Sequence, residues 1–135
     1  MEAEMPERRK EQRKNLMSYS QVFELYEGRL LGYLADLTPK GAMVIGDQPV
    51  PLDSTFTLQI ELPELPEVKA SRMSLPARVV WCQSDLSPDY HDIGFEFTEV
   101  RPEQLQIIKA MMENYEFRRE PPNYSPRAPD FEDNA

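Results

Sequence analysis

Closely spaced turn signals divide this chain into short segments in which apolar and polar residues alternate. The clearest is residues 54–62, "STFTLQIEL", which places Phe56, Leu58, Ile60 and Leu62 on one face. Shorter alternating segments are "QVFELY", "RLLGYLADL", "AMVI", "LPARVVWCQ" and "YHDIGFEFTEV". Strands this short, joined by tight turns, favour a small antiparallel barrel or sandwich. Thirteen prolines in 135 residues also argue against a bundle of helices.

The same alternation predicts which residues of three further strands point into the core. The predicted inner faces are Leu31, Tyr33, Ala35 and Leu37 in residues 29–37, Ala77, Val79 and Trp81 in residues 75–83, and Ile93, Phe95 and Phe97 in residues 90–100. A hairpin turn is predicted at Glu27–Gly28, where glycine follows an acidic residue. A second turn is predicted at Thr38–Gly41, because Pro39 and Gly41 suit its inner and last positions.

The apolar period changes to a helical one near residue 102. In "RPEQLQIIKAMMENYEF" the apolar stripe is formed by Leu105, Ile108, Met112 and Tyr115. Pro102 fits the first helical position, since its missing N–H has no partner there. The pattern predicts one amphipathic helix that covers an open end or flank of the barrel. Ile107 and Met111 fall outside the predicted stripe, and they are candidates for a docking surface.

Charge is distributed unevenly along the chain, which has a net charge of −9. Five of the seven residues 8–14, "RRKEQRK", are basic. We therefore expect a flexible basic arm over residues 1–15, a folded domain over residues 16–118 and a disordered, Pro-rich acidic tail over residues 119–135. The acidic balance argues against general nucleic-acid binding. One possible function of the arm is a weak, salt-dependent contact with nucleic acid or an anionic membrane.

The residue types needed for most catalytic and metal sites are scarce. Cys82 is the only cysteine and His91 the only histidine, so no internal disulfide, Cys-based metal site or His-rich metal site is expected. The five glycines are scattered singly and form no phosphate loop. No apolar run approaches 18 residues, and the first fifteen residues do not resemble a secretory signal. We expect a cytoplasmic protein that is not an enzyme and has no transmembrane segment.

Two motifs carry chemistry that could bind an anion. The first is Arg9-x-x-x-Arg13, with Arg8 beside it, since arginine binds phosphate through paired hydrogen bonds and stacks on flat rings. The second is the segment 36–41, "DLTPKG", where an acid, a hydroxyl and a glycine surround one turn. Asp36 could accept from the N–H groups of a guanine. Each motif alone also fits an interpretation without a ligand. The arginines could belong to a solvated arm, and the second motif could be an Asx-type turn.

In this order the two motifs resemble those of the PilZ domain, a bacterial receptor module for cyclic di-GMP. The family signature is R-x-x-x-R followed by [D/N]-x-S-x-x-G, and "RKEQR" and "DLTPKG" are similar to them. The segments "ARVVWC" and "DIGFEF" resemble the family's two closing strands, and the similarity covers about residues 8–118. The resemblance implies a mainly β fold, a six-stranded antiparallel β-barrel with a C-terminal α-helix.

The resemblance also implies a site. Its ligand-binding residues would be Arg8, Arg9, Arg13, Asp36, Thr38 and Gly41, with Trp81 a candidate for stacking on a guanine. Thr38 stands where the family usually has serine, which keeps the hydroxyl and adds a methyl group. The implied function is a non-catalytic cyclic di-GMP receptor that acts on an unidentified effector protein and needs no cofactor. The alternative is an adaptor of the same fold that binds protein but no nucleotide.

Overall fold

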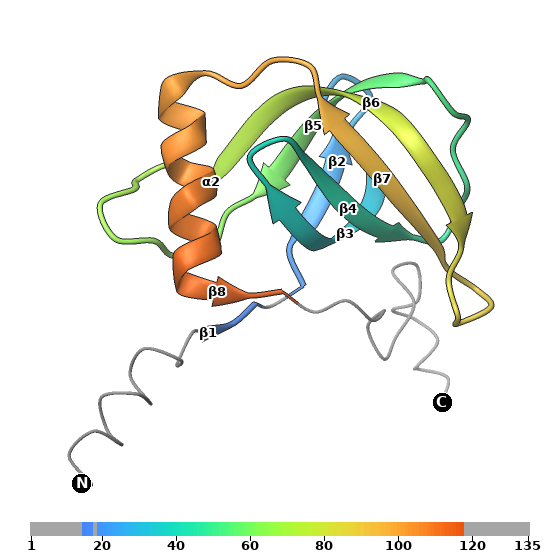
Figure 1. Cartoon of the computed structure of the whole chain (residues 1–135), viewed down its shortest axis with the longest axis horizontal. Helices are drawn as coiled ribbons and strands as arrows, with labels where there is room; N and C mark the ends of the chain where they lie inside the picture. Colours follow the sequence, from blue (N-terminus) through green and yellow to red (C-terminus); the bar gives the residue numbers. More distant parts are fainter. Residues whose placement is uncertain (1–14, 18, 118–135) are drawn as a thin grey trace, which may run out of the picture.

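The computed structural model describes residues 15–17 and 19–117, and its centre is a closed antiparallel barrel (Figure 1). The barrel strands are β2 (Gln21–Glu24), β3 (Arg29–Thr38), β4 (Gly41–Gly46), β5 (Thr55–Glu61), β6 (Arg72–Ser84) and β7 (His91–Phe97). Their order around the barrel is β2-β3-β4-β7-β6-β5, and pairing of β2 with β5 closes it. The helix α2 (Pro102–Asn114) follows the last barrel strand. The predicted six-stranded barrel with a C-terminal helix is confirmed.

Alternation predicted the inner faces of β5 and β7 correctly. Leu58, Ile60 and Ile93 are fully buried, and Phe95 and Phe97 are nearly so. Both predicted turns are also present, between β2 and β3 and between β3 and β4. These strands keep one register with their neighbours over most of their length, so period-2 alternation is preserved from end to end.

The prediction for β3 was right for Leu31 and Leu37 and wrong for Tyr33 and Ala35. The reason is that the strand register shifts twice, against β2 on either side of Leu31 and against β4 between Leu34 and Asp36. A bulge adds one residue to a strand and exchanges its two faces beyond that point. Leu31, Leu34 and Leu37 therefore belong to the main core. Ala35 lies instead in a small separate cluster on the other face, with Ile45 and Tyr90.

Helix α2 lies against one end of the barrel and buries a stripe different from the predicted one (Figure 1). Its buried residues are Gln104, Ile108 and Met111. Met111 has no exposed surface and Ile107 packs half-buried against the core, so the predicted docking surface on these two residues was wrong. The start of α2 is fixed by Gln104, whose Oε1 accepts from the Arg101 N–H at 3.0 Å. Its Nε2 donates to the Ser74 carbonyl of β6 at 2.6 Å.

A two-stranded parallel sheet joins the two ends of the described chain. Its strands are β1 (Asn15–Leu16) and β8 (Tyr115–Glu116), and the Met17 N–H donates to the Glu116 carbonyl at 2.9 Å. This sheet was not predicted from the sequence. The predicted basic arm and acidic tail lie outside the described residues, apart from Asn15. In residues 15–17 and 19–117, no helix is long and apolar enough to cross a membrane.

Candidate functional site

A groove of about 460 Å³ lies on the outer surface of the barrel, where the β3–β4 turn approaches β6 and β7. Its volume falls within the usual range for sites that bind small molecules. Four of the residues predicted from the sequence line it, namely Asp36, Thr38, Gly41 and Trp81. They come from β3, β4 and β6, so the fold brings together residues that are up to 45 positions apart in the sequence. The other three predicted residues, Arg8, Arg9 and Arg13, lie outside the described residues.

The Thr38 hydroxyl organises the β3–β4 turn. Its Oγ1 accepts from the backbone N–H groups of Lys40 at 3.1 Å and Gly41 at 3.2 Å, and it lies 3.4 Å from the Gly41 carbonyl, to which it donates. Beside it, Oδ1 of Asp36 accepts from the Leu37 N–H at 2.9 Å. These bonds hold the turn between two barrel strands, so the polar groups of the motif occupy defined positions.

Gly41 is required by the close approach of β7. A Cβ at this position would lie 2.2 Å from the carbonyl oxygen of Phe95, a backbone atom that cannot move without displacing the strand. The sequence left open whether this glycine served a close approach or a positive φ. The structure supports the close approach, because Gly28 and Gly32 are the described glycines with positive φ.

Trp81 does not share a face with Val79, so this prediction was wrong. The register of β6 against β7 shifts between Val79 and Trp81, which leaves Val79 fully buried and turns Trp81 outward. The Trp81 side chain is 40% exposed, and it lies along the groove over Gly94 of β7. The bulge therefore moves the chain's single tryptophan from a core position to the wall of the groove.

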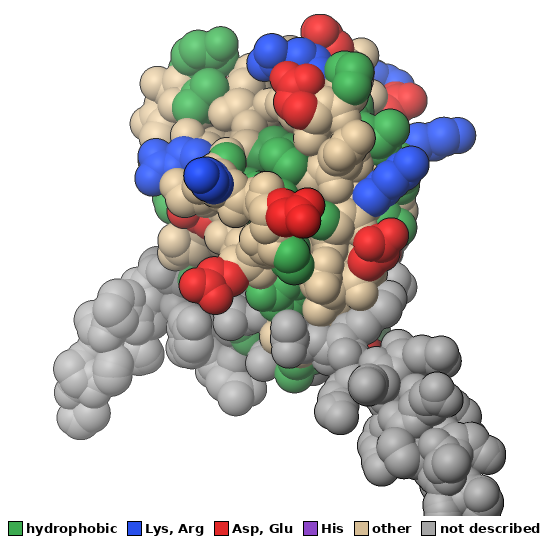
Figure 2. Space-filling model, turned by 90° about the vertical axis from the view of Figure 1, so that its left-hand side faces the viewer, with side chains coloured by type: hydrophobic (Ala, Val, Ile, Leu, Met, Phe, Trp, Pro, Cys, Tyr) green, Lys and Arg blue, Asp and Glu red, His purple; other side chains and the backbone are tan. Residues whose placement is uncertain are grey.

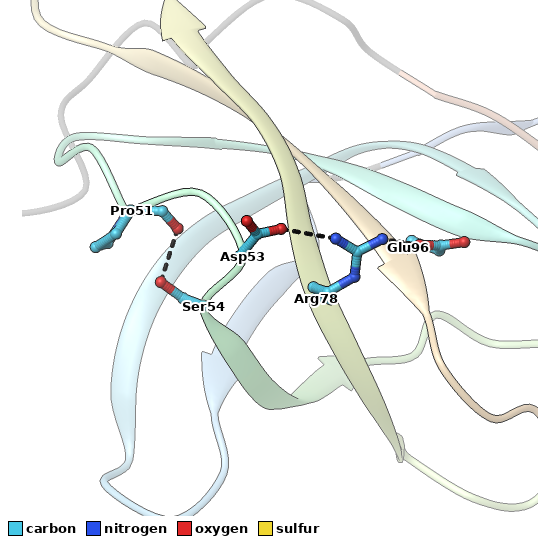
Figure 3. Close-up of polar contacts among 5 residues, drawn as sticks. All are labelled: Pro51, Asp53, Ser54, Arg78 and Glu96. Carbon is cyan, nitrogen blue, oxygen red and sulfur yellow. Dashed lines mark hydrogen bonds and ion pairs between the residues drawn. The ribbon is translucent and has the colours of Figure 1, made fainter.

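Sequence reasoning missed Glu96, which lies at the edge of the groove directly opposite Gly41 in the β4–β7 register. Glu96 accepts from Nη2 of Arg78 at 2.7 Å, and Nη1 of Arg78 donates to Asp53 at 2.7 Å (Figure 3). Hydrogen bonds to Glu96, and next to Asp53, raise the pKa of Arg78 above its ordinary value. The outward position of Glu96 in "DIGFEF" was visible in the sequence, but its partner strand was not.

The charges on the described wall of the groove are nearly balanced once the ion pair between Arg78 and Glu96 is included. Asp36 and Glu96 are acidic, and Lys40 is the basic residue among the described lining residues. This wall offers acceptors for N–H groups, and it offers little positive charge for a phosphate. A ligand with both guanines and phosphates would need cations from another part of the chain.

A second acidic pair lies at the far end of β7, outside this groove. Burial, followed by a hydrogen bond to Asp85 and the charge of Asp85, raises the pKa of Asp92 to about 6. Oδ1 of Asp92 is buried and has no hydrogen-bond partner among the described residues. Within residues 15–17 and 19–117, no three His, Cys, Asp or Glu side chains are grouped so that they could hold a metal ion.

The face of the molecule on which α2 lies shows acidic and basic side chains interspersed (Figure 2). No patch of a single charge covers the described part of this face. A nucleic acid or an anionic membrane would be bound by a continuous basic surface. The alternative of nucleic-acid or membrane binding was placed on the basic arm, which lies outside the described residues.

Comparison with known protein families shows to which family the chain belongs. The family model for the PilZ domain matches residues 7–114. The chain belongs to the PilZ domain family. The matched range includes both the R-x-x-x-R segment and the whole of the barrel. No curated protein sequence matches the chain.

Two solved PilZ-like structures share the fold. The PilZ domain with c-di-GMP of YcgR from Escherichia coli aligns with a TM-score of 0.52 at 14% identity, over 69% of this chain and 77% of that one. The Bacillus subtilis Inhibitor of motility, MotI/DgrA, aligns with a TM-score of 0.54 at 17% identity, over 70% of this chain. The alignment spans 44% of the length of MotI/DgrA. At these identities the likeness shows a common fold.

Proposed function

We propose that this PilZ-domain protein is a non-catalytic receptor for cyclic di-GMP that passes the signal to an effector protein. The observation that carries the proposal is the groove itself. Asp36, Thr38, Gly41 and Trp81 were selected from sequence motifs, and all four line one groove of suitable volume. The PilZ domain of YcgR with c-di-GMP supports the same ligand class.

Each part of the ligand has a matching group in the proposal. The carboxylates of Asp36 and Glu96 accept from guanine N–H groups, and the exposed face of Trp81 stacks on a guanine ring. Lys40 is the one basic residue among the described lining residues, so Arg8, Arg9 and Arg13 supply the positive charge for the two phosphates. No cofactor or metal takes part, and the receptor works in the cytoplasm. Motility, biofilm or pilus functions are the proposed outputs.

Calorimetric titration with cyclic di-GMP tests this function. We expect the wild-type protein to bind, and we expect Arg13→Ala to weaken binding by about 10- to 100-fold, because a charge-assisted hydrogen bond to phosphate is lost. Arg72→Ala is the matched control, since Arg72 is exposed at the opposite end of β6 from Trp81 and should bind as wild type does. Equal heats for wild type and Arg13→Ala would remove Arg13 from the site.

The alternative is an adaptor that binds protein without nucleotide. Thr38 in place of the usual serine motivated it, but the Thr38 hydroxyl still accepts from both turn amides, so the substitution leaves the turn intact. Absence of heat for the wild type at high micromolar cyclic di-GMP would favour the adaptor.

A further inference from the structure

The indole of Trp81 occupies the space where a side chain on Gly94 would begin. A Cβ on Gly94 would lie 2.2 Å from Cε2, 2.3 Å from Nε1 and 2.7 Å from Cδ2 of Trp81. Cε2 and Cδ2 form the bond shared by the two rings, at the middle of the indole. The contact therefore involves the face of the ring and not its edge. One face of Trp81 lies on Gly94, and the side chain remains 40% exposed along the groove.

The surroundings of Gly94 differ from those of the other barrel glycines. Added Cβ atoms on Gly41 and Gly46 would first meet backbone carbonyl oxygens, of Phe95 and Leu31, each at 2.2 Å. The three nearest atoms to a Cβ on Gly94 all belong to the Trp81 side chain. Glycine at 41 and 46 is thus required by strand spacing, whereas glycine at 94 is required by the ring. A side chain at 94 would displace the indole and leave the strands in place.

We propose that Gly94 is a positioning residue that holds the Trp81 indole flat against β7, as a preformed platform for a planar purine ring. This inference rests on the proposed function, because it specifies how the groove recognises a guanine base. The β6 bulge turns Trp81 outward, and Gly94 then sets the height and tilt of the ring. Neither feature produces the platform alone.

A fixed ring binds a base more tightly than a mobile one, because its rotamer is already ordered before the ligand arrives. An alanine at 94 would push the indole away from β7, and the open side of the ring is the groove. The displaced ring would then lose its fixed orientation and also occupy ligand volume. We expect Gly94→Ala to weaken cyclic di-GMP binding by about tenfold or more, the loss typical of a base–aromatic stack.

Trp81 is the only tryptophan in the chain, so tryptophan fluorescence, excited at a wavelength where the six tyrosines absorb little, reports on this platform alone. We expect Gly94→Ala to shift the emission of the free protein and to increase its quenching by acrylamide. Gly28→Ala is the matched control. It is also a glycine-to-alanine change and is strained by a φ of +68°, but a Cβ there meets nothing within 4 Å. Its emission, quenching and affinity should match those of the wild type within about twofold, the margin allowed for a residue remote from the groove.

A double-substitution cycle with Trp81→Ala separates the platform from a general effect on the barrel. In the Trp81→Ala background, Gly94→Ala should change neither the urea midpoint nor the affinity, because the clashing atoms are gone. Equal destabilisation by Gly94→Ala in both backgrounds would overturn the inference, and so would wild-type quenching and affinity in Gly94→Ala. If the wild type itself binds no cyclic di-GMP, the proposed function fails. The quenching and unfolding measurements need no ligand and still decide whether Gly94 positions the ring.

Discussion

At the scale of the residue, Thr38 holds its turn with one oxygen atom that accepts from two backbone N–H groups. We predict that Thr38→Val, which keeps the shape and removes this acceptor, lowers the free energy of unfolding by about 1 kcal/mol, because the turn is exposed and water can replace part of the bonding. It should also weaken cyclic di-GMP binding, since the turn lines the groove.

Thr38→Ser is the control for this substitution, because it keeps the hydroxyl and restores the usual family residue. It should retain wild-type stability within a few tenths of a kcal/mol and wild-type affinity. Urea unfolding and calorimetry measure both quantities. Wild-type values for Thr38→Val would show that the hydroxyl is dispensable.

Asp92 allows a prediction of how the free energy of unfolding changes with pH. Its pKa is raised from an ordinary 3.8 to about 6, so the folded protein holds a proton that the unfolded chain has already released. The free energy of unfolding should therefore fall as the pH rises from about 4 to about 6, and this loss persists at pH 7. Asp92→Asn should stabilise the protein at pH 7 by about 1 kcal/mol, a figure reduced for the partial solvent exposure of the site.

Urea unfolding between pH 4 and pH 7 measures this effect. Asp89→Asn, which removes an exposed carboxyl from the loop that precedes β7, is the control and should keep the wild-type pH profile. If the free energy of unfolding of Asp92→Asn depends on pH as that of the wild type does, Asp92 is not the group responsible for the pH dependence.

At the scale of the element, α2 is joined to β6 by the buried side chain of Gln104. We predict that Gln104→Ala lowers the free energy of unfolding by about 2 kcal/mol, because it leaves the Ser74 carbonyl without this donor and the Arg101 N–H without this acceptor. Gln106→Ala changes the same residue type on the exposed face of α2 and should have little effect. Thermal and urea unfolding compare the two, and equal losses would rule out the Gln104 link.

Elements whose residues alternate without interruption could be predicted from the sequence alone. The strand β5 is such a case, since one face of Phe56, Leu58 and Ile60 packs inward along its whole length. The strands β3 and β6 were placed correctly but their faces were predicted only in part, because a bulge changes the backbone without leaving a fixed signal in residue type. The two-residue strands β1 and β8 are too short to show any period.

The same limit applies to the candidate site. Asp36, Thr38 and Gly41 could be found because they belong to one motif with recognisable spacing, and Trp81 because its strand resembles one of the family. Glu96 and Gly94 contribute through their neighbours on β4 and β6, and these neighbours follow from strand register. Register depends on pairing between distant segments, so local sequence could not identify them.

At the scale of the whole molecule, the short β1–β8 sheet connects the segment that follows Arg13 to the end of α2. If the arginines take part in ligand binding, this sheet is the described structure nearest to them in sequence. We predict that cyclic di-GMP slows amide hydrogen exchange at Met17, whose N–H donates to the Glu116 carbonyl. The Gly28 amide, in the remote β2–β3 turn, is the control and should exchange as before. Unchanged exchange at Met17 under saturating ligand would show that the sheet does not respond.

The register of this sheet places Asn15 beside Tyr115 and Leu16 beside Glu116, so the chain enters and leaves the barrel at neighbouring positions. Adjacent strands lie about 4.8 Å apart. Because the two strands run parallel, the chain reaches Asn15 from one end of the pair and leaves Glu116 at the other end, so the entering and leaving segments lead in opposite directions. The β1–β8 pair thus sets the domain between two segments that leave it on opposite sides, a geometry suited to a link within a longer line of domains rather than to insertion into one loop.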